Sequence, residues 1–515
     1  MIAQEVKKLN YFVNGGPRLS ESTDYFDIWD PSIGEVIAQA PDCTEREVNL
    51  AVQAAKDAFP AWADTSPMKR VQVLYKFRDL IDRNLTELTR MCATEHGKVW
   101  EEAQGDVLKA KEVVEVACGI PSMLVGESLM NASPGYDTVL YREPLGVFAG
   151  IAPFNFPAMI PMGWMMPLCI ATGNTLVLRP SPVTPMTSLR MVELLYEAGL
   201  PSGVVNLVTC GAKQAEGLVK HPDIQGIMFV GSTRVGEQVY ATAAAHGKRV
   251  QALCQAKNHA LVMEDASIER TARGIINGAF GCAGERCMAL PVVAVHEKVA
   301  DELVKCLIDF AKARKIGPSY DKSSELGPLV TEQHRNSVTR WIERGVAEGA
   351  SLVLDGRGAV VDGYERGFYL GPCIFDNVEP GMSIGEQEIF GPVLCVKRVK
   401  SFEEGINIVN ANPYANGSVI FTQNGFYSRE FARRAHAGLF GVNVGIPVPV
   451  SIFPFSGRKK SFFGDLHTMG KDGIRFFTEV KSVTTTWFNE EEMKKEKIDT
   501  WDGMLNTSHP PQTSR

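Results

Sequence analysis

The segment GCAGERCMAL, residues 281–290, places a cysteine directly after a glycine-containing loop. A catalytic cysteine has to be reachable and ionised, and Gly284 lets the backbone come close to a ligand. The competing interpretation is a buried cysteine that packs as a small hydrophobic residue, which is the usual state of a free thiol. Taken alone, the segment supports a nucleophilic Cys287 and a purely structural one equally.

Two further segments place polar side chains where a strand is expected to end. In PFNFP, residues 153–157, the Asn155 amide is positioned to donate a hydrogen bond to a developing oxyanion, although an asparagine that completes a turn is the commoner case. In FVGSTRVG, residues 229–236, Gly231 allows a phosphate to approach and Ser232 is positioned to cap the following helix. This segment is not GxGxxG, so by itself it only weakly predicts a dinucleotide site.

The segment EQEIFGPVL, residues 386–394, contains an isolated Glu388, which on its own is typical of a surface carboxylate. The nine histidines are dispersed, and Cys282 and Cys287 lie five residues apart without a second pair of ligands. This spacing does not match a zinc site, so no metal ligands are predicted.

These residues stand at the ends of elements that alternate along the chain. From Leu145 to His246, short apolar strands alternate with helices, which is typical of βαβ units and a parallel sheet. A second alternation runs from about Asn258 to Val444 and predicts another α/β domain. The expected strands are 145–152, 174–179, 203–208 and 226–230, and the expected helices are 157–171, 187–198, a short one ending at 220, and 233–246.

The regions outside this alternation have different patterns. The first 120 residues are expected to be mostly helical, because 45–62 and 68–96 carry apolar residues three and four positions apart. Residues 123–142 contain glycines and a proline among short strand-like pieces, which predicts a projecting hairpin. From about Glu490 the chain is polar, and a loose tail is expected there.

The composition is that of a globular protein. A length of 515 residues suits several domains of about 150 residues each. With 45% apolar and 22% charged residues the chain is neither disordered nor fibrous, and a net charge of −7 without a basic stripe argues against a nucleic-acid partner. The cysteines show no paired spacing, no signal peptide is recognisable, and the longest apolar run, 156–171, is too short to span a bilayer. We therefore expect a cytoplasmic protein with no membrane partner.

In this order the motifs resemble the aldehyde dehydrogenase superfamily over about residues 10–488. The stretches that carry the likeness are GIAPFNFPAMIP, HGKRVQAL, AKNH, AGERCMAL, EIFGPVL and GVNVGIPVPV. HGKRVQAL with AKNH, and GVNVGIPVPV, are similar to the CoA-acylating methylmalonate-semialdehyde dehydrogenase group in particular. The resemblance implies an α/β fold with a Rossmann-like cofactor domain, an α/β catalytic domain and a β-hairpin oligomerisation arm.

The resemblance also implies domain boundaries. The NAD(P)-binding domain comprises 1–122 and 143–257, the catalytic domain 258–454, the oligomerisation arm 123–142 with 471–488, and a polar C-terminal tail 489–515. The arm is expected to pair between subunits in a homodimer or homotetramer. A lone hairpin exposes unpaired strand edges, which is an independent reason to expect a partner.

By this resemblance Cys287 is similar to a nucleophile that forms a thiohemiacetal and then a thioester. The Asn155 amide and the Cys287 backbone N–H are similar to the oxyanion hole. The implied cofactor positions are Arg179 at the adenosine ribose, Gly231 and Ser232 at the pyrophosphate, and Glu388 with Phe390 at the nicotinamide ribose.

Leu253 stands where hydrolytic members of the superfamily have the glutamate that activates water. A leucine accepts no proton, so hydrolysis of the thioester loses its usual base. This matches the acylating group, in which coenzyme A takes the acyl unit instead. We therefore group Leu253 with the residues expected to line the cofactor site. Gln255 stands where a small residue is usual, and we expect it to narrow the channel near the nicotinamide.

Two arginines hold the substrate carboxylate in the acylating group. Arg286 matches the first, and Lys109, in GDVLK, stands at the second. A lysine keeps the charge but loses the fork of an arginine, so another anionic or a merely polar aldehyde fits as well. An exposed helix lysine is an equally weighted interpretation of Lys109.

The adenosine ribose position also departs from the pattern. Pro182 stands where a glutamate usually contacts the ribose, three residues after the ribose-binding position. Without this glutamate no carboxylate repels a 2′-phosphate, and Arg179 would attract one. The use of NAD by the acylating group favours NAD, with NADP as the alternative.

The sequence therefore predicts NAD-dependent oxidation of a small, anionic semialdehyde, such as methylmalonate or malonate semialdehyde, to an acyl-CoA. Coenzyme A is the implied co-substrate. One alternative is a non-acylating, NAD(P)-dependent enzyme that releases a carboxylic acid. Another is a catalytically silent paralogue, against which the intact set of Cys287, Asn155 and Glu388 argues.

Overall fold

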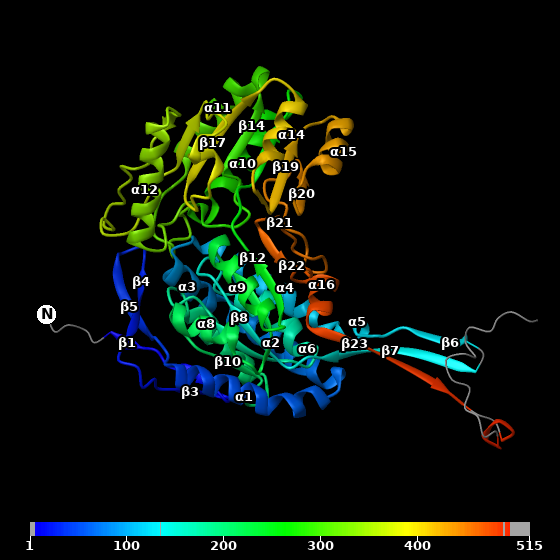
Figure 1. The fold of residues 1–515 in the computed structure, drawn as a ribbon. Helices are drawn as coiled ribbons and strands as arrows, with labels where there is room; N and C mark the ends of the chain where they lie inside the picture. Colours follow the sequence, from blue (N-terminus) through cyan, green and yellow to red (C-terminus); the bar gives the residue numbers. More distant parts are fainter. Residues whose placement is uncertain (1–5, 134, 488–489, 495–515) are drawn as a thin grey trace, which may run out of the picture.

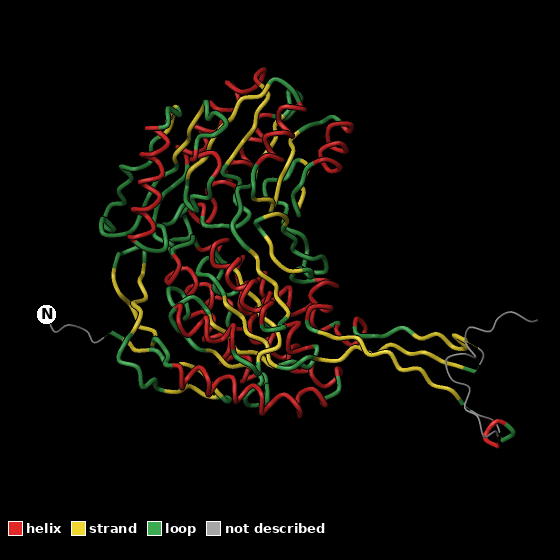
Figure 2. Tube along the Cα trace, viewed as in Figure 1, coloured by secondary structure: helices red, strands yellow, loops and turns green. Residues whose placement is uncertain are grey.

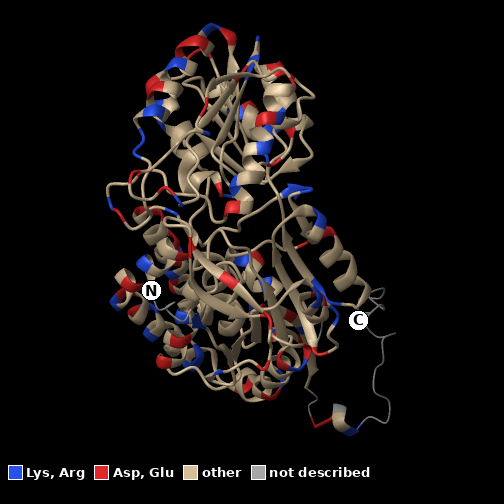
Figure 3. Ribbon diagram, turned by 90° about the vertical axis from the view of Figure 1, so that its left-hand side faces the viewer, with Lys and Arg blue, Asp and Glu red and all other residues tan. Residues whose placement is uncertain are grey.

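The computed structural model describes residues 6–133, 135–487 and 490–494 of the chain. Two α/β lobes stand one above the other, and a narrow arm of strands projects from the lower lobe (Figure 1). Acidic and basic residues are interspersed on both lobes in the view of Figure 3. Within the described residues, no helix is long and apolar enough to cross a membrane.

The lower lobe is built on an eight-stranded sheet in the order β22-β12-β11-β8-β9-β10-β2-β3. Its central strands from β12 to β10 run parallel, which confirms the expected βαβ units, and antiparallel strands close both edges. The strands are β2 (Tyr11–Val13), β3 (Gly16–Arg18), β8 (Val147–Ile151), β9 (Thr175–Arg179), β10 (Val205–Leu207), β11 (Ile224–Val230), β12 (Arg249–Leu253) and β22 (Phe462–Gly464).

Side chains alternate between the two faces of this sheet, as extended strands require. Val147 and Ala149 of β8 pack with helices on one face, whereas Phe148 packs with helices on the other. The first face carries α1 (Glu45–Asp64), α8 (Ala212–Lys220) and α9 (Thr233–Ala245). The second carries α2 (Pro67–Arg83), α3 (Leu85–His96), α4 (Trp100–Cys118), α5 (Ile120–Met123), a π-helix (Met159–Met165), α6 (Pro167–Ala171) and α7 (Met186–Glu197).

The upper lobe is built on a seven-stranded sheet in the order β15-β16-β17-β14-β13-β19-β20, parallel except for β15. Its strands are β13 (His259–Val262), β14 (Val292–His296), β15 (Ser351–Leu354), β16 (Cys373–Asp376), β17 (Val393–Val399), β19 (Gly417–Phe421) and β20 (Leu439–Val442). Its helices are α10 (Ile268–Phe280), α11 (Glu297–Ala313), α12 (Glu332–Ala347), α13 (Ser383–Glu386), α14 (Phe402–Ala411) and α15 (Gly425–Arg434). This is the second alternation expected from the sequence.

The projecting arm is a three-stranded antiparallel sheet in the order β23-β7-β6 (Figure 2). The expected hairpin is confirmed as β6 (Ser128–Ser133) and β7 (Tyr136–Pro144), and β23 (Thr478–Thr486) adds the third strand. From β20 the chain reaches β23 through β21 (Arg458–Lys459), β22 and α16 (Gly470–Phe476), and β21 pairs with the short β18 (Tyr414–Ala415). The expected tail lies mostly outside the described residues, apart from a short 3₁₀ turn at Glu492–Lys494.

The expectation of helix for most of the first 120 residues is wrong for the part before α1. That part forms β2, β3 and a separate three-stranded sheet of β1 (Lys7–Lys8), β4 (Tyr25–Asp30) and β5 (Glu35–Pro41). The turn between β4 and β5 contains Gly34 at φ 65°, where an added Cβ would lie 2.1 Å from a carbonyl oxygen. The tight turn at Gly34 lets β4 and β5 pair, so this part of the chain forms strands. The helical spacing of apolar residues begins only at Glu45, the first residue of α1.

Candidate active site

Cys287 lies where two cavities meet, and it lines both of them. The chain reaches it from α10 through a 3₁₀ turn, Gly281–Gly284. Cys282, Ala283 and Gly284 all have positive φ, of 49°, 51° and 77°. A Cβ added to Gly284 would lie 2.2 Å from the carbonyl oxygen of Gly391, so this glycine permits the close approach of the Gly391 backbone, whereas the approach to a ligand stays a prediction.

The first cavity, of about 220 Å³, runs from Cys287 towards the N-terminus of α9. The rings of Phe154 and Phe390 stand on its wall, with centroids 5.8 Å apart in an edge-to-face arrangement. Six of the residues predicted for the site line it together: Asn155, Gly231, Ser232, Cys287, Glu388 and Phe390.

The second cavity, of about 440 Å³, lies on the other side of Cys287 and has both predicted substrate cations, Arg286 and Lys109, on its wall. Much of the remaining wall is apolar. Those apolar residues are Phe156, Met159, Trp164, Met288, Ile446, Val448 and Phe455.

Two predicted cofactor residues do not line either cavity. The Arg179 guanidinium donates from Nε and Nη2 to the carbonyl oxygen of Cys210, at 3.0 and 2.7 Å. Leu253 is 7% exposed and packs in the hydrophobic core, whereas the next residues, Cys254 and Gln255, reach the first cavity. A leucine at this position leaves the cavity without a carboxylate there.

The thiol of Cys287 is only partly exposed, and burial raises its pKa to about 12. The neighbouring Glu388 carboxylate acts in the same direction, while the Arg286 guanidinium opposes it. The carbonyl oxygen of Cys287 accepts hydrogen bonds from Nδ2 of Asn258 and of Asn416, at 2.9 and 3.2 Å. These bonds fix the backbone of the cysteine, but the thiol itself is protonated at neutral pH in this state.

Asn155 is held by a buried ion pair that sequence reasoning did not identify. Its carbonyl oxygen accepts a 2.6 Å hydrogen bond from Lys98 Nζ, and Lys98 pairs with Asp106 at 3.1 Å. Asp106 also accepts the backbone N–H of Met159 at 2.7 Å, which fixes the far end of the PFNFP loop. The side-chain amide of Asn155 donates to the carbonyl of Glu285, at 3.1 Å, and so connects this loop to the cysteine loop.

Glu285 is a second buried charged residue that sequence reasoning missed. Its carboxyl lies 3.9 Å from Nε2 of His96 and 3.6 Å from Nε2 of His334. Burial raises the pKa of Glu285 well above its usual range and lowers the pKa of both histidines. The contact with Asn155 is made by the backbone carbonyl of Glu285 and not by its carboxyl group.

The N-terminus of α9 is not capped by Ser232, contrary to the expectation from the sequence. Ser232 occupies the cap position without a side-chain hydrogen bond, and Oε1 of Gln255 accepts the backbone N–H of Thr233 at 3.1 Å instead. Gln255 also hydrogen-bonds Glu388, whose pKa burial raises to about 7. Gln255 thus lines the first cavity and links the helix terminus to Glu388; that it narrows a nicotinamide channel stays a prediction.

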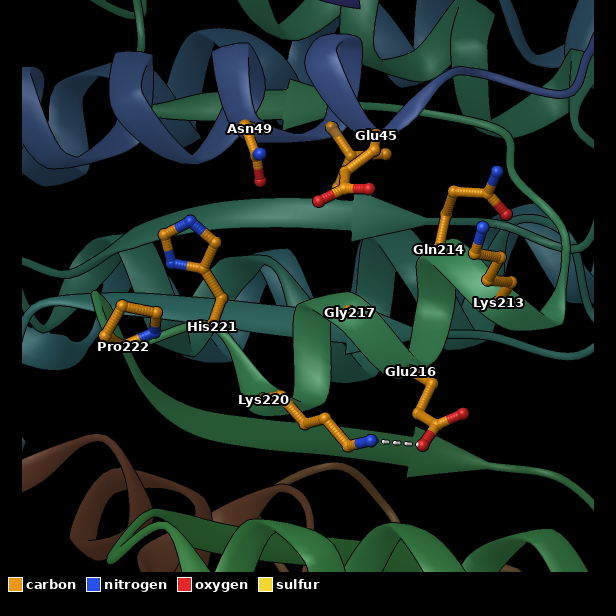
Figure 4. Close-up of a pocket in the computed structure, with 10 residues that line it drawn as sticks. Glu45, Asn49, Lys213, Gln214, Glu216, Gly217, Lys220, His221 and Pro222 are labelled. Atoms are coloured by element: carbon orange, nitrogen blue, oxygen red, sulfur yellow. Dashed lines mark ion pairs between the residues drawn. The ribbon is translucent and has the colours of Figure 1, made fainter.

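Another cavity, of about 540 Å³, lies between α1 and α8 (Figure 4). Polar and charged side chains surround it, among them Glu45, Lys213 and an ion pair of Glu216 with Lys220 at 2.5 Å. None of the residues predicted for the site lies on its wall, so it is separate from the cysteine centre.

The two α/β lobes, the arm and the cysteine at the junction of two cavities together define an aldehyde dehydrogenase fold. The chain belongs to the aldehyde dehydrogenase family, whose sequence model matches residues 18–483. It is 44% identical over 488 residues to a malonate-semialdehyde dehydrogenase of Bacillus cytotoxicus, which covers 95% of this chain and 100% of that protein. A malonate-semialdehyde dehydrogenase of Pseudomonas aeruginosa is 45% identical over 480 residues, covering 93% of this chain and 96% of its own.

Solved structures show the same likeness. A methylmalonate-semialdehyde dehydrogenase of Oceanimonas doudoroffii superposes with a TM-score of 0.93 at 40% identity, over 94% of this chain and 99% of its own. A putative methylmalonate-semialdehyde dehydrogenase of Sinorhizobium meliloti, in complex with NAD, gives the same values. The family resemblance and the fold class predicted from the sequence are thereby confirmed.

The Lys98–Asp106 pair leads to a prediction about the position of Asn155. In Lys98→Met, Asp106 is left buried without its cation, and we expect a loss of about 3–5 kcal/mol in the free energy of unfolding, measured by urea titration. The double variant Lys98→Met/Asp106→Asn removes the uncompensated charge and recovers most of this loss. Its turnover is expected to stay at least about tenfold below wild type, because Asn155 is no longer held.

Lys111→Met is the matched control for this pair, because Lys111 lies on the same helix and pairs with Asp82 at the surface. It is expected to change the free energy of unfolding by less than about 1 kcal/mol. Wild-type turnover in the double variant would show that Lys98 does not position Asn155.

The raised pKa of Cys287 leads to a prediction about its alkylation. At pH values below the pKa, the thiolate fraction rises about tenfold for each pH unit. We therefore expect iodoacetamide to label Cys287 about tenfold faster at pH 9 than at pH 8, with no plateau, as measured by peptide mass spectrometry. A plateau below pH 8 would mean that the thiol is already ionised in the free protein. The Cys287→Ala variant identifies the peptide.

Proposed function

We propose that this protein oxidises malonate or methylmalonate semialdehyde to an acyl-CoA, with NAD as the hydride acceptor and coenzyme A as the acyl acceptor. One observation carries the proposal: the Cys287 thiol is reached from two separate cavities. An aldehyde in the larger cavity and a nicotinamide in the smaller one would meet at the same sulfur. The names of the similar proteins from Bacillus cytotoxicus and Oceanimonas doudoroffii support the substrate class.

The smaller cavity fits a nicotinamide nucleotide. Its aromatic wall suits a flat ring, and it borders the N-terminus of α9, which favours phosphate groups. In this proposal Glu388 and Phe390 hold the nicotinamide ribose, Gly231 and Ser232 contact the pyrophosphate, and Arg179 reaches the adenosine ribose. When bound, the nicotinamide accepts the hydride that leaves the substrate carbon.

The residues of the chain then account for the covalent chemistry. The Cys287 thiolate attacks the aldehyde carbon, and the Asn155 amide with the Cys287 N–H stabilises the oxyanion of the thiohemiacetal. Loss of the hydride leaves a thioester on Cys287. Attack by the thiol of coenzyme A releases the acyl group and regenerates the cysteine. With Leu253 in place of a carboxylate, water has no base at that position.

One observation favours the non-acylating alternative. Glu388 lines the same cavity as Cys287, and its pKa of about 7 suits a general base at neutral pH. A Glu388 that activates water would release a free carboxylic acid. In the acylating proposal Glu388 is engaged with the cofactor instead.

The choice between NAD and NADP rests on a similar protein and on two residues proposed to lie near the adenosine ribose. NAD is supported by the complex of the Sinorhizobium meliloti relative with NAD. Pro182 and Arg179 keep NADP as the alternative, because no carboxylate at Pro182 repels a 2′-phosphate.

The arm supports the proposal of a homodimer or homotetramer. Leu129 and Met130 of β6 and Val480 of β23 are more than half exposed, at 62%, 82% and 55%, and a partner subunit would bury them. The domain assignment made from the sequence stays a proposal. It leaves β22 unassigned, and this strand pairs with β12 of the lower sheet. A cytoplasmic location likewise stays a proposal.

The decisive experiment is cofactor reduction by the purified protein with malonate semialdehyde and NAD, with and without coenzyme A. We expect turnover to depend strongly on coenzyme A and to give an acyl-CoA, identified by mass spectrometry. A free acid formed equally fast without coenzyme A would establish the hydrolytic alternative, and Glu388→Gln would then abolish it. The same assay with NADP measures the nucleotide preference.

Cys287→Ala is the control for this experiment. Loss of the thiol is expected to remove all cofactor reduction, because no thiohemiacetal can form. Wild-type turnover in this variant would refute the mechanism. An inactive wild-type protein with an unreactive Cys287 would instead point to a catalytically silent paralogue.

A further inference from the structure

The two cations of the substrate cavity are already paired with glutamates of α4. Lys109 Nζ lies 2.8 Å from Glu112, and Arg286 Nη2 lies 3.1 Å from Oε1 of Glu102. A carboxylate that enters the cavity therefore meets compensated charges, and the rest of the wall is largely apolar. The two ion pairs differ in how many N–H donors of the cation remain free for a ligand.

The Lys109 ammonium has no donor to spare. Its three N–H groups are matched by three acceptors, the two carboxylate oxygens of Glu112 at 3.0 and 2.8 Å and the carbonyl of Pro449 at 3.1 Å. Glu112 also accepts the backbone N–H of Ser451, at 2.7 Å. Lys109 and Glu112 thus fasten the loop around Pro449 to α4, and Lys109 is a structural cation here.

Arg286 keeps capacity for a ligand. Nε lies 3.2 Å from Sγ of Cys282 and Nη2 contacts Glu102, but within the described residues Nη1 has no hydrogen-bond partner. Nη1 packs beside Gly281, where an added Cβ would lie 2.4 Å from it, and the Arg286 side chain lines the cavity. Nη1 is therefore the guanidinium nitrogen that remains for a carboxylate.

Glu102 is the competitor for this guanidinium. Its Oε1 accepts both the Arg286 N–H and the backbone N–H of Cys282, the latter at 2.8 Å, and its side chain is only 16% exposed. It stands in the first turn of α4, where the helix dipole stabilises a negative charge. The Glu102 carboxylate therefore lies close to the place that a substrate carboxylate would take.

We propose that Glu102 is a specificity-determining residue that opposes the substrate carboxylate at Arg286. It weakens the binding of anionic aldehydes and leaves neutral aldehydes of the same length unaffected. The proposal deepens the proposed function, because it assumes that the aldehyde enters this cavity. Glu102 retains a positioning role as well, since it orders the loop that carries Cys287, and the experiment has to separate charge from position.

The variant Glu102→Gln separates them, because the amide oxygen can still accept both hydrogen bonds while the charge is removed. With saturating NAD and coenzyme A, we expect the KM for malonate semialdehyde to fall about tenfold, with kcat within about twofold of wild type. The KM for propanal, a neutral aldehyde of the same length, should change less than about twofold. A KM for the semialdehyde that is unchanged or raised, or equal changes for both aldehydes, would overturn the proposal.

The matched control is Glu101→Gln, which removes the same charge from the neighbouring residue of α4; Glu101 also borders the cavity, but it is exposed to solvent. It should shift the KM for the semialdehyde less than about twofold, because an exposed charge is screened by solvent. A fall equal to that in Glu102→Gln would attribute the effect to net charge rather than to the contact with Arg286.

A binding measurement keeps this proposal distinct from the proposed function. Malonate carries carboxylates but no aldehyde, and its binding can be followed by calorimetry in the full-length protein without turnover. We expect Glu102→Gln to bind malonate about tenfold more tightly than wild type. Equal affinities would overturn the role of Glu102. An absence of turnover with tighter malonate binding in the variant would refute only the proposed function.

Discussion

The buried ion pair of Lys98 and Asp106 is the interaction on which the geometry of the active site depends. Both side chains are fully buried, so each would be strongly destabilising without the other. The ammonium contacts the carbonyl of Asn155, and the carboxylate contacts the N–H of Met159. The PFNFP loop is thereby held at two points by charges that belong to α4 and the turn before it.

The PFNFP loop in turn contacts the loop that carries Cys287. The Asn155 amide donates to the carbonyl of Glu285, two residues before Cys287. Glu285 itself is buried beside His96 and His334, and burial raises the pKa of its carboxyl group. In the proposed mechanism the Lys98–Asp106 pair is therefore the electrostatic anchor of the loop that carries the Asn155 amide.

The sequence predicted the α/β elements well because their apolar periodicity reflects burial on the two faces of a sheet. It predicted six residues of the first cavity because their motifs, taken together and in order, resemble those of the aldehyde dehydrogenase family, whereas the segment of Glu388 alone indicated a surface carboxylate. It did not predict Lys98, Asp106 or Glu285, because their partners are distant in the chain and a lone charge in a helix is usually solvated. The strands before Glu45 were missed for a related reason, since β4 and β5 are specified by pairing across one turn.

On both sides of Cys287, side chains of the protein accept hydrogen bonds from donors that the proposed ligands would use. In the cavity proposed for the cofactor, Gln255 accepts the N–H of Thr233 at the helix terminus that favours phosphate. In the cavity proposed for the substrate, Glu102 accepts the N–H of Arg286. Each contact satisfies a donor that would otherwise face an apolar cavity without a partner, which stabilises the unliganded site. At Arg286 the contact with Glu102 is compatible with ligand binding, since Nη1 has no partner within the described residues, but the negative charge of Glu102 lowers the affinity for an anionic ligand.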